Sequence, residues 1–449
     1  MMTTNPHSDR SVIGERQITF GRGNHLLTNT HVWSYDGRCI YYDVRSDVAG
    51  SLFDGNRIER VHVESGEVEL VYQAKDAACV GVVTASPVED KVVFIHGPEH
   101  PSEDWQYSAW HRRGVLVKPG QPQSITNLDA RDIVPPYTPG ALRGGTHVHV
   151  FSGDGRWVSF TYEDHVLATS TAANAGQNQR NVGVSVPVSA AEVPATHPRN
   201  HDGSMFSVLV TQTSDAPPPG SDQITRAYSD AWIGNHGYHR RDGSGQSRAL
   251  AFIGDVVSDD GRTVPELFMV DIPDDVTVAG DLPLCGTPLT RPAPPQGTVQ
   301  RRLTFTTERK FPGLGPVRHW PRSSPDGSKI AFLMRDDAGR IQLWLASPTE
   351  PDIRQLTDND FSVESAFTFR SDGLAIACVA GGRVCEVDIL DGKTTPLTSP
   401  ADPATAPRPE AVVYSPNGKQ VAYMRPDAAV TATATAPPNQ IFIASTQLG

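Results

Sequence analysis

Residues 144–164, GGTHVHVFSGDGRWVSFTYED, contain an alternating run, the step Asp154-Gly155, and then a second alternating run. Asp-Gly supplies the positive φ angles of a two-residue turn, so this stretch predicts two strands joined by a tight hairpin. Its core, FSGDGRWVSFTYE (151–163), has relatives at 33–43, 323–334, 369–379 and 414–424, with a looser copy at 85–95. The shared pattern is Ser, any residue, Asp or Asn, Gly, and then a strand.

Short strands that recur every few tens of residues are typical of a β-propeller. Sustained helical periodicity is almost absent, which favours an all-β fold. We count seven units and expect one propeller domain over residues 1–449, with blades starting near 29, 79, 145, 228, 317, 363 and 408. The last unit has only three strands, and RQITFG (16–21) precedes the first unit without a partner. We therefore expect residues 16–21 to close the ring as the outer strand of blade seven.

The bulk composition restricts the partners. The chain has 39 Lys+Arg against 51 Asp+Glu, a formal net charge of −12, which argues against nucleic acid or an anionic membrane as the main partner. No signal peptide or spanning segment is apparent. The five cysteines form no CxxC pair, and four lie in or beside apolar strand-like runs. We expect buried thiols in a cytoplasmic protein, and a monomer, because a closed propeller needs no partner.

Several histidines occupy related positions in the first strand of their units. Counted back from the Asp or Asn of each turn, His31 and His149 lie at minus five, whereas His147, His319 and Glu410 lie at minus seven. Strand residues two apart share a face, so these side chains are predicted to converge at the channel mouth opposite the turns. A single half-buried strand histidine would be ordinary; four at related register in three blades favour a site.

Loops predicted at the same mouth add cationic side chains, which would form an anion-binding basin on an otherwise acidic protein. Most such arginines in isolation are solvated surface charges. The loop candidates are Arg45, Arg57, His96, His100, Arg112, Tyr162, Glu163, Arg180 and Arg335, with Arg318 beside His319.

The repeat, as in SSPDGSKIAFLM (323–334), resembles the TolB-type propeller repeat over essentially the whole chain. HVHVFSGDG (147–155) also resembles oligogalacturonate lyases, seven-bladed propellers in which two such histidines, a third histidine and a glutamine hold a divalent metal. That resemblance implies Mn²⁺ or Ca²⁺ on His147 and His149, with His319 or His31 as third ligand; Gly144 stands where the family has its glutamine. Rhamnose–glucuronate lyases are similar propellers that use histidine, tyrosine and arginine against a uronate. The overall likeness is to a bacterial group of TolB-like propellers, the YidR type, which implies a fold but no activity.

Together these features lead us to expect a carbon–oxygen lyase that cleaves an acidic oligosaccharide by β-elimination. His147, His149, Tyr162 and Arg180 are the predicted catalytic residues. The predicted substrate-binding residues are His31, Arg45, His96, His100, Arg318 and Arg335.

Two alternatives remain open: a non-catalytic propeller that binds a sugar or protein, and a hydrolase related to propeller-bearing serine peptidases. The second lacks a GxSxG motif. His197 and His201, four residues apart, could form a further site. A polar turn before a strand is the simpler interpretation of this segment.

Overall fold

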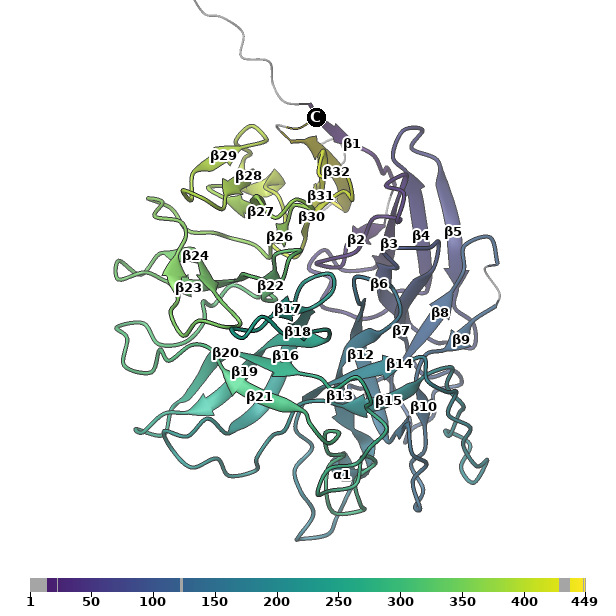
Figure 1. The fold of residues 1–449 in the computed structure, drawn as a ribbon. Helices are drawn as coiled ribbons and strands as arrows, with labels where there is room; N and C mark the ends of the chain where they lie inside the picture. The colour runs from purple at the N-terminus through teal and green to yellow at the C-terminus, as the bar shows by residue number, and fades with distance from the viewer. Residues whose placement is uncertain (1–13, 22, 122–123, 428–436, 447, 449) are drawn as a thin grey trace, which may run out of the picture.

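The computed structural model describes residues 14–21, 23–121, 124–427, 437–446 and 448. Across these residues, seven four-stranded antiparallel sheets follow one another around a circle (Figure 1). The predicted all-β, seven-bladed propeller is confirmed. In each of the first six blades the innermost strand comes first in the sequence, and the chain then moves outward.

Blades one to four occupy the first two thirds of the chain. Their strands are β2 (Asn24–Leu26), β3 (Cys39–Arg45), β4 (Arg57–His62) and β5 (Val68–Gln73); β6 (Val80–Ala85), β7 (Val92–His96), β8 (Arg113–Val117) and β9 (Thr126–Asn127); β12 (Gly144–Phe151), β13 (Val158–Asp164), β14 (Asn181–Val186) and β15 (Phe206–Leu209); and β16 (Ile224–Trp232), β19 (Ala249–Val257), β20 (Thr263–Asp271) and β21 (Val299–Arg302).

Blades five to seven complete the circle. Their strands are β22 (Arg322–Ser323), β23 (Ile330–Arg335), β24 (Ile341–Ala346) and β25 (Arg354–Gln355); β26 (Thr368–Phe369), β27 (Ala375–Ala380), β28 (Arg383–Asp388) and β29 (Thr394–Pro396); and β30 (Val412–Tyr414), β31 (Gln420–Pro426) and β32 (Asn439–Ser445). Outside the blades lie the pair β10 (Ala130–Arg131) and β11 (Ala141–Leu142), the hairpin β17 (Tyr238–His239) and β18 (Gly245–Gln246), helix α1 (His165–Ala168) and the 3-10 turn η1 (Pro403–Thr405).

The ring closes with the N-terminal strand, as the sequence predicts. Strand β1 (Glu15–Gln17) pairs antiparallel with β32 as the outer strand of blade seven, and Figure 1 shows the two side by side. It is shorter than the predicted 16–21, although the amide of Ile18 still donates to Ile441 O at 2.9 Å. Buried apolar residues of blade seven, such as Val413 and Ile441, pack with Val32 and Val61 of blade one. Closure therefore rests on both a strand pair and a shared core.

The repeated Ser-x-Asp/Asn-Gly turn has a local physical basis. In blade three, the hydroxyl of Ser152 donates to Asp154 at 2.6 Å and accepts the amide of Trp157 at 3.0 Å, while Gly155 has φ +69°. The same serine–carboxylate or serine–amide bond recurs in other blades as Ser34–Asp36, Ser324–Asp326 and Ser415–Asn417. Each turn thus satisfies its own polar groups, and glycine takes the left-handed position.

The innermost strands of blades two, three and four are bulged. Their pairing with the next strand shifts register at Gly81/Thr84, His147/Val150 and Tyr228/Ala231. At the three bulges Val82, Val148 and Ser229 have φ values of +58°, +53° and +56°. Positive φ is costly for residues other than glycine, and most of all for the β-branched Val82 and Val148, so these bulges are strained points of the channel wall.

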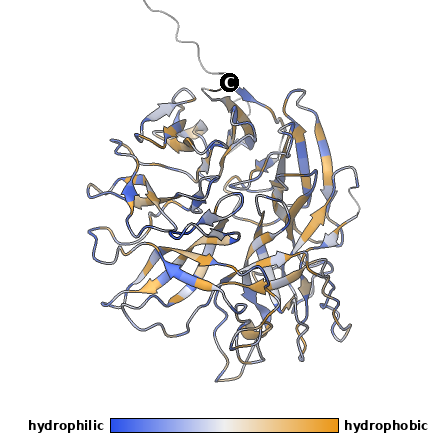
Figure 2. Ribbon diagram, viewed as in Figure 1, coloured by the Kyte–Doolittle hydropathy of each residue, from blue (hydrophilic) through white to orange (hydrophobic). Residues whose placement is uncertain are grey.

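The strands carry both hydrophobic and hydrophilic residues, and β21 is largely hydrophilic (Figure 2). The cores lie between neighbouring blades: one joins Val184 and Phe206 of blade three to Phe252 and Val270 of blade four. In the part of the chain that the structure describes, no helix is both long and apolar enough to span a bilayer.

Candidate functional site

A cavity of about 350 Å³ opens among blades three, four and five, at the channel end opposite the Ser-x-Asp-Gly turns. Its wall is formed by the first half of β12, the middle of β16 and the segment 314–320 that precedes β22. We call it the arginine cavity, because Arg180, Arg226 and Arg318 line it and no aspartate or glutamate does. This is the mouth at which the sequence predicts the site.

The three arginines are held in different ways. The Arg180 guanidinium bonds Glu163, with Nε 2.8 Å from the carboxylate. Arg226 stacks over the Tyr228 ring at 4.5 Å, and Arg318 over Trp320 at 5.0 Å. Burial lowers the pKa of Arg180 and of Arg318, although both remain cationic at neutral pH. Two of the three cations thus rest on aromatic faces, which leaves their N–H groups free to bind an anion.

His147 lies in this cavity, 8% exposed. The hydroxyl of Thr161 is 2.8 Å from its Nδ1 and 2.9 Å from its Nε2, so it can bond one ring nitrogen at a time. Burial, reinforced by Arg112, Arg180 and Arg318, holds the pKa of His147 well below 6.5. The imidazole is therefore neutral in the free protein and has a nitrogen able to accept a proton.

His149 does not lie in the cavity, and the prediction that the two histidines share a face is wrong. The bulge at Val148 reverses the alternation, and the ring of His149 points between blades two and three. There its Nε2 is 3.0 Å from Thr146 Oγ1, and a Cβ built on Gly114 would lie 2.7 Å from the same nitrogen. Burial lowers its pKa to about 3, as for a neutral residue of the interblade core.

The remaining predicted members of the cluster also separate. His319 lines the arginine cavity, but its Nδ1 donates to Val317 O at 2.8 Å and its Nε2 accepts from the Leu333 amide at 3.2 Å. His31 lies at the other end of the channel, in the wall of a second cavity. Glu410 pairs with Arg408 at 2.9 Å and raises the pKa of Arg318 from a distance. The prediction that all these side chains converge at one mouth is therefore wrong.

The histidines that the sequence suggested as metal ligands do not fit a metal site. His147 and His149 point apart, His319 has both nitrogens engaged, and within the described ranges no three His, Cys, Asp or Glu side chains are grouped as metal ligands would be. A glutamine cannot occupy position 144 without a rearrangement, because a Cβ there would lie 2.0 Å from Glu163 O. The departure at Gly144 thus has a steric cause.

Tyr162 is a structural residue. It is 1% exposed; its hydroxyl accepts from the Arg143 amide at 3.2 Å and donates to Asp164 at 3.0 Å, beside the buried pair Arg143–Asp164. Its neighbour Thr161 faces the cavity instead, because successive strand residues alternate. The cavity tyrosine is Tyr228, whose hydroxyl donates to Asp255 at 3.0 Å. The alternating TRAYSD (225–230) was the available signal, but the next Asp-Gly step, Asp242-Gly243, is twelve residues further on and does not fix the register of this strand.

The other predicted binding residues lie outside the arginine cavity. Arg45 pairs with Asp43 at 2.7 Å, Arg57 with Glu59 at 2.6 Å, and Arg112 donates to Tyr107 at 3.2 Å. His96 is buried between Tyr72 and Gly97 O, and His100 is exposed near Asp76. Of these residues, only Arg112 is among those that lower the pKa of His147. Arg45 in turn lowers the pKa of Arg318, which lines the arginine cavity. The side chains predicted to gather at this mouth therefore do not line the cavity, although Arg112 and Arg45 act on residues that do.

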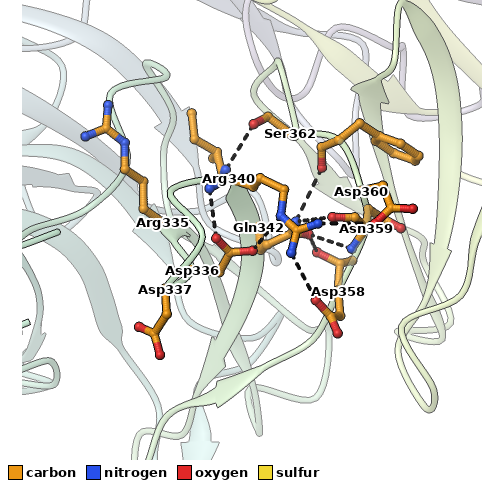
Figure 3. A network of polar contacts seen from close by, with 12 residues as sticks. Arg335, Asp336, Asp337, Arg340, Gln342, Asp358, Asn359, Asp360 and Ser362 are labelled. Atoms are coloured by element: carbon orange, nitrogen blue, oxygen red, sulfur yellow. Dashed lines mark hydrogen bonds and ion pairs between the residues drawn. The ribbon is translucent and has the colours of Figure 1, made fainter. Parts of the chain in front are cut away.

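Arg335 has a separate environment on blade five, where it stacks over Phe311 at 5.6 Å. Figure 3 shows its side chain directed away from a network centred on Arg340. Arg340 contacts Asp336 at 3.0 Å and Asp360 at 3.3 Å, so it ties the β23–β24 hairpin to the segment before blade six. This cluster is a structural ion network.

His197 and His201 do not form a joint site. The ring of His197 lies near Trp105, whereas His201 is half-buried beside β10 and its backbone bonds Arg131. Trp105 stacks on His111, and Nε2 of His111 is 3.0 Å from Nδ1 of His165. This aromatic cluster joins the loops of blades two and three.

The chain is similar to proteins of unknown function and, in fold, to solved lyase structures. Residues 79–201 match a family of proteins of unknown function, DUF3748. YidR of Escherichia coli K12, itself uncharacterized, is 49% identical over 422 residues, 93% of this chain and 96% of YidR. An oligogalacturonate lyase in complex with manganese superposes with a TM-score of 0.58 at 10% identity, over 96% of this chain and 92% of the lyase. The oligogalacturonate lyase of Vibrio parahaemolyticus gives 0.56 at 9%, over 98% and 94%. At these identities the structural likeness shows the fold alone.

Proposed function

This chain belongs to the YidR family, and we propose that it cleaves a uronic-acid-containing oligosaccharide by β-elimination in the arginine cavity. One observation carries the proposal: three arginines and a neutral histidine line a single cavity without any carboxylate, in a chain of net charge −12. The likeness in fold to oligogalacturonate lyases supports the class of reaction. Because the identity to these lyases is only 9–10%, the role of each residue in this chain is argued from its own chemistry.

The first requirement is charge neutralisation. β-Elimination removes the proton alpha to the uronate carboxylate, and negative charge develops on that carboxylate as the C–H bond breaks. Guanidinium groups of Arg226 and Arg318, and of Arg180 beside Glu163, would bind the carboxylate and stabilise this charge. Because the predicted metal ligands do not fit a metal, the arginines supply the positive charge in this proposal.

The second requirement is a base. His147 is neutral in the free protein, because burial and, to a lesser degree, the surrounding arginines hold its pKa low. A bound carboxylate opposes those charges, so its arrival raises the proton affinity of His147. His147 would then take the proton from C5, and the electrons of that C–H bond form the C4–C5 double bond as the C4–O bond breaks.

The third requirement is a proton for the departing oxygen. Burial and the hydrogen bond to Asp255 raise the pKa of Tyr228, so its hydroxyl is protonated at neutral pH. In the free protein this proton lies in the bond to Asp255, so the proposal requires the hydroxyl to turn from Asp255 to the departing oxygen and give it the proton as the C4–O bond breaks.

The chain's five free cysteines support a cytoplasmic location for this reaction.

The second candidate function is binding of an acidic saccharide without cleavage. The contact of Thr161 with the His147 ring favours it, because a hydrogen-bonded imidazole is less available as a base. Both functions predict saturable binding of uronates, and only the first predicts a new double bond.

The test is ultraviolet absorbance of the unsaturated uronate after incubation with galacturonate, glucuronate and ulvan-type oligosaccharides, with EDTA or with added Mn²⁺ or Ca²⁺. We expect product in EDTA, loss of product in His147→Ala, and normal rates in His100→Ala, an exposed matched control. Binding without product would establish the second candidate. Absence of both binding and product would overturn the proposal, and product formed only with added metal would refute the role of the arginines.

A further inference from the structure

A second cavity of about 270 Å³ lies at the turn-side end of the channel. All seven blades contribute to its wall, through the residues just before or within each turn region. We call it the turn-side cavity. The level of Asp230 separates it from the arginine cavity, since Ser229 lines one cavity and Ala231 the other.

The wall of the turn-side cavity is mostly apolar and its rings are fixed. Trp33 donates its indole N–H to Val413 O at 3.0 Å, and Trp232 donates to Val150 O at 2.9 Å. Tyr414 donates to Glu386 at 2.9 Å, outside the cavity lining. Rings held in this way form a preorganised surface for a flat apolar body.

The charge of the cavity is positive. Its lining contains Arg322 and Arg370 and no aspartate or glutamate. Arg370 is neutralised by Asp372 and Glu386, each at 3.0 Å. Arg322 bonds the amide side chain and carbonyl of Asn29, and it forms no ion pair with any carboxylate of the described ranges. It is 7% exposed, so its charge is buried. The carboxylate of Asp230 offsets part of the effect of burial on the pKa of Arg322 without forming an ion pair with it.

Unsatisfied polar atoms surround this guanidinium. Arg322 Nε and His31 Nδ1 are buried and have no hydrogen-bond partner. Asp230 lies between the two cavities, and neither of its carboxylate oxygens has a partner at normal hydrogen-bond geometry. Burial raises its pKa, and the nearby hydroxyl of Ser159 opposes this effect only in part. Buried polar atoms without partners are rare in folded proteins, and here two residues that carry such nitrogens line the same cavity.

We propose that the turn-side cavity is a second ligand site, which binds a small planar monocarboxylate between Trp33 and Trp232 with its anionic group on Arg322. A guanidinium fits a carboxylate in shape and charge, and His31 would supply a further donor. The cavity volume suits a single-ring acid rather than a polymer. This site lies at the opposite end of the channel from the proposed lyase site and does not depend on it.

The test uses benzoate and phenylacetate as probes, with benzamide and phenylacetamide as uncharged matches. Titration calorimetry and quenching of tryptophan fluorescence report binding, and inorganic phosphate tests for an anion of different shape. We expect saturable binding of the acids, at least about tenfold weaker binding of the amides, and a similar loss for the acids in Arg322→Met. Arg318→Met, which alters the arginine cavity, should leave benzoate affinity unchanged.

Three results would overturn the assignment of a carboxylate site to the turn-side cavity. Equal affinity for acid and amide would remove the role of charge, and loss of binding in Arg318→Met would place the ligand at the arginine cavity. Tighter binding of phosphate than of every acid would refute the carboxylate. If Arg322→Met does not fold, the acid–amide comparison on the unaltered protein and the variant Trp232→Phe, which should weaken acid binding, still decide the matter.

Discussion

His147 and His149 lie two residues apart in β12, yet one lines the arginine cavity and the other lies between two blades. The difference arises at Val148, whose φ of +53° interrupts the alternation of the strand. A pair that looks like a ligand set in the sequence is thus one candidate base and one core residue. The two substitutions should therefore fail in different ways.

We expect His147→Ala to abolish uronate turnover and to cost less unfolding free energy than His149→Ala, since the His147 ring, although only 8% exposed, borders the arginine cavity. His149→Ala should instead cost about 2–4 kcal/mol, because it removes a buried ring and the contact with Thr146. Denaturant unfolding and product absorbance on both variants are the measurements. Normal stability of His149→Ala would contradict the placement of that ring between the blades.

Tyr228→Phe and Tyr162→Phe form a matched pair that removes the same atom in two places. Tyr228→Phe should lower the rate by about a hundredfold, because the leaving oxygen loses its proton donor. Tyr162→Phe should cost about 1 kcal/mol of stability through its lost bonds to Arg143 and Asp164 and leave the rate unchanged. Initial rates and thermal unfolding measure both effects, and an inactive but stable Tyr162→Phe would reverse the assignment.

Gly144→Gln tests whether the glutamine of the metal-binding pattern can be restored. A Cβ at Gly144 would lie 2.0 Å from Glu163 O and 2.8 Å from Asp164 Cα, so β13 would have to shift. We expect a loss of about 3 kcal/mol or more and no gain in bound metal. Elemental analysis and denaturant unfolding provide the readout. A stable variant that binds stoichiometric manganese would show that the two histidines are able to turn together.

The fold was predictable because its signals are local. Ser152, Asp154 and Gly155 satisfy one another within a single turn, and that turn recurs in four blades with nearly the same bonds. The closing strand was predictable for a related reason. The C-terminal part of the chain supplies only three strands of blade seven, and residues 16–21 have no other strand beside them in the sequence.

The site was predictable only as a location. His147, Arg180, Arg318 and His319 do line one cavity at the predicted end of the channel, and its use as the functional site stays a prediction. Individual side chains were misplaced where the backbone departs from ideal alternation, as at Val148, or where no turn fixed the count, as at Tyr228. Positive φ at a valine leaves no mark in the sequence, because nothing in the residue type suggests it.

Asp230→Asn tests the electrostatics of the channel level between the two cavities. Burial raises the pKa of Asp230 from 3.8 to about 6, so the folded state binds a proton that the unfolded chain has released between these values. The contribution of this group to stability is therefore fully present below pH 4 and falls as the pH rises to 6, by about 3 kcal/mol in all. An amide carries no charge, so the variant should be more stable than the unaltered protein at pH 7, and this advantage should vanish near pH 4.

Denaturant unfolding of both proteins across this range measures the difference. The buried histidines, whose pKa values are lowered, affect both proteins alike, so their contributions cancel. A variant that is less stable at pH 7 would show that ionised Asp230 is held by contacts with Arg322 or Ser159 that outweigh its burial.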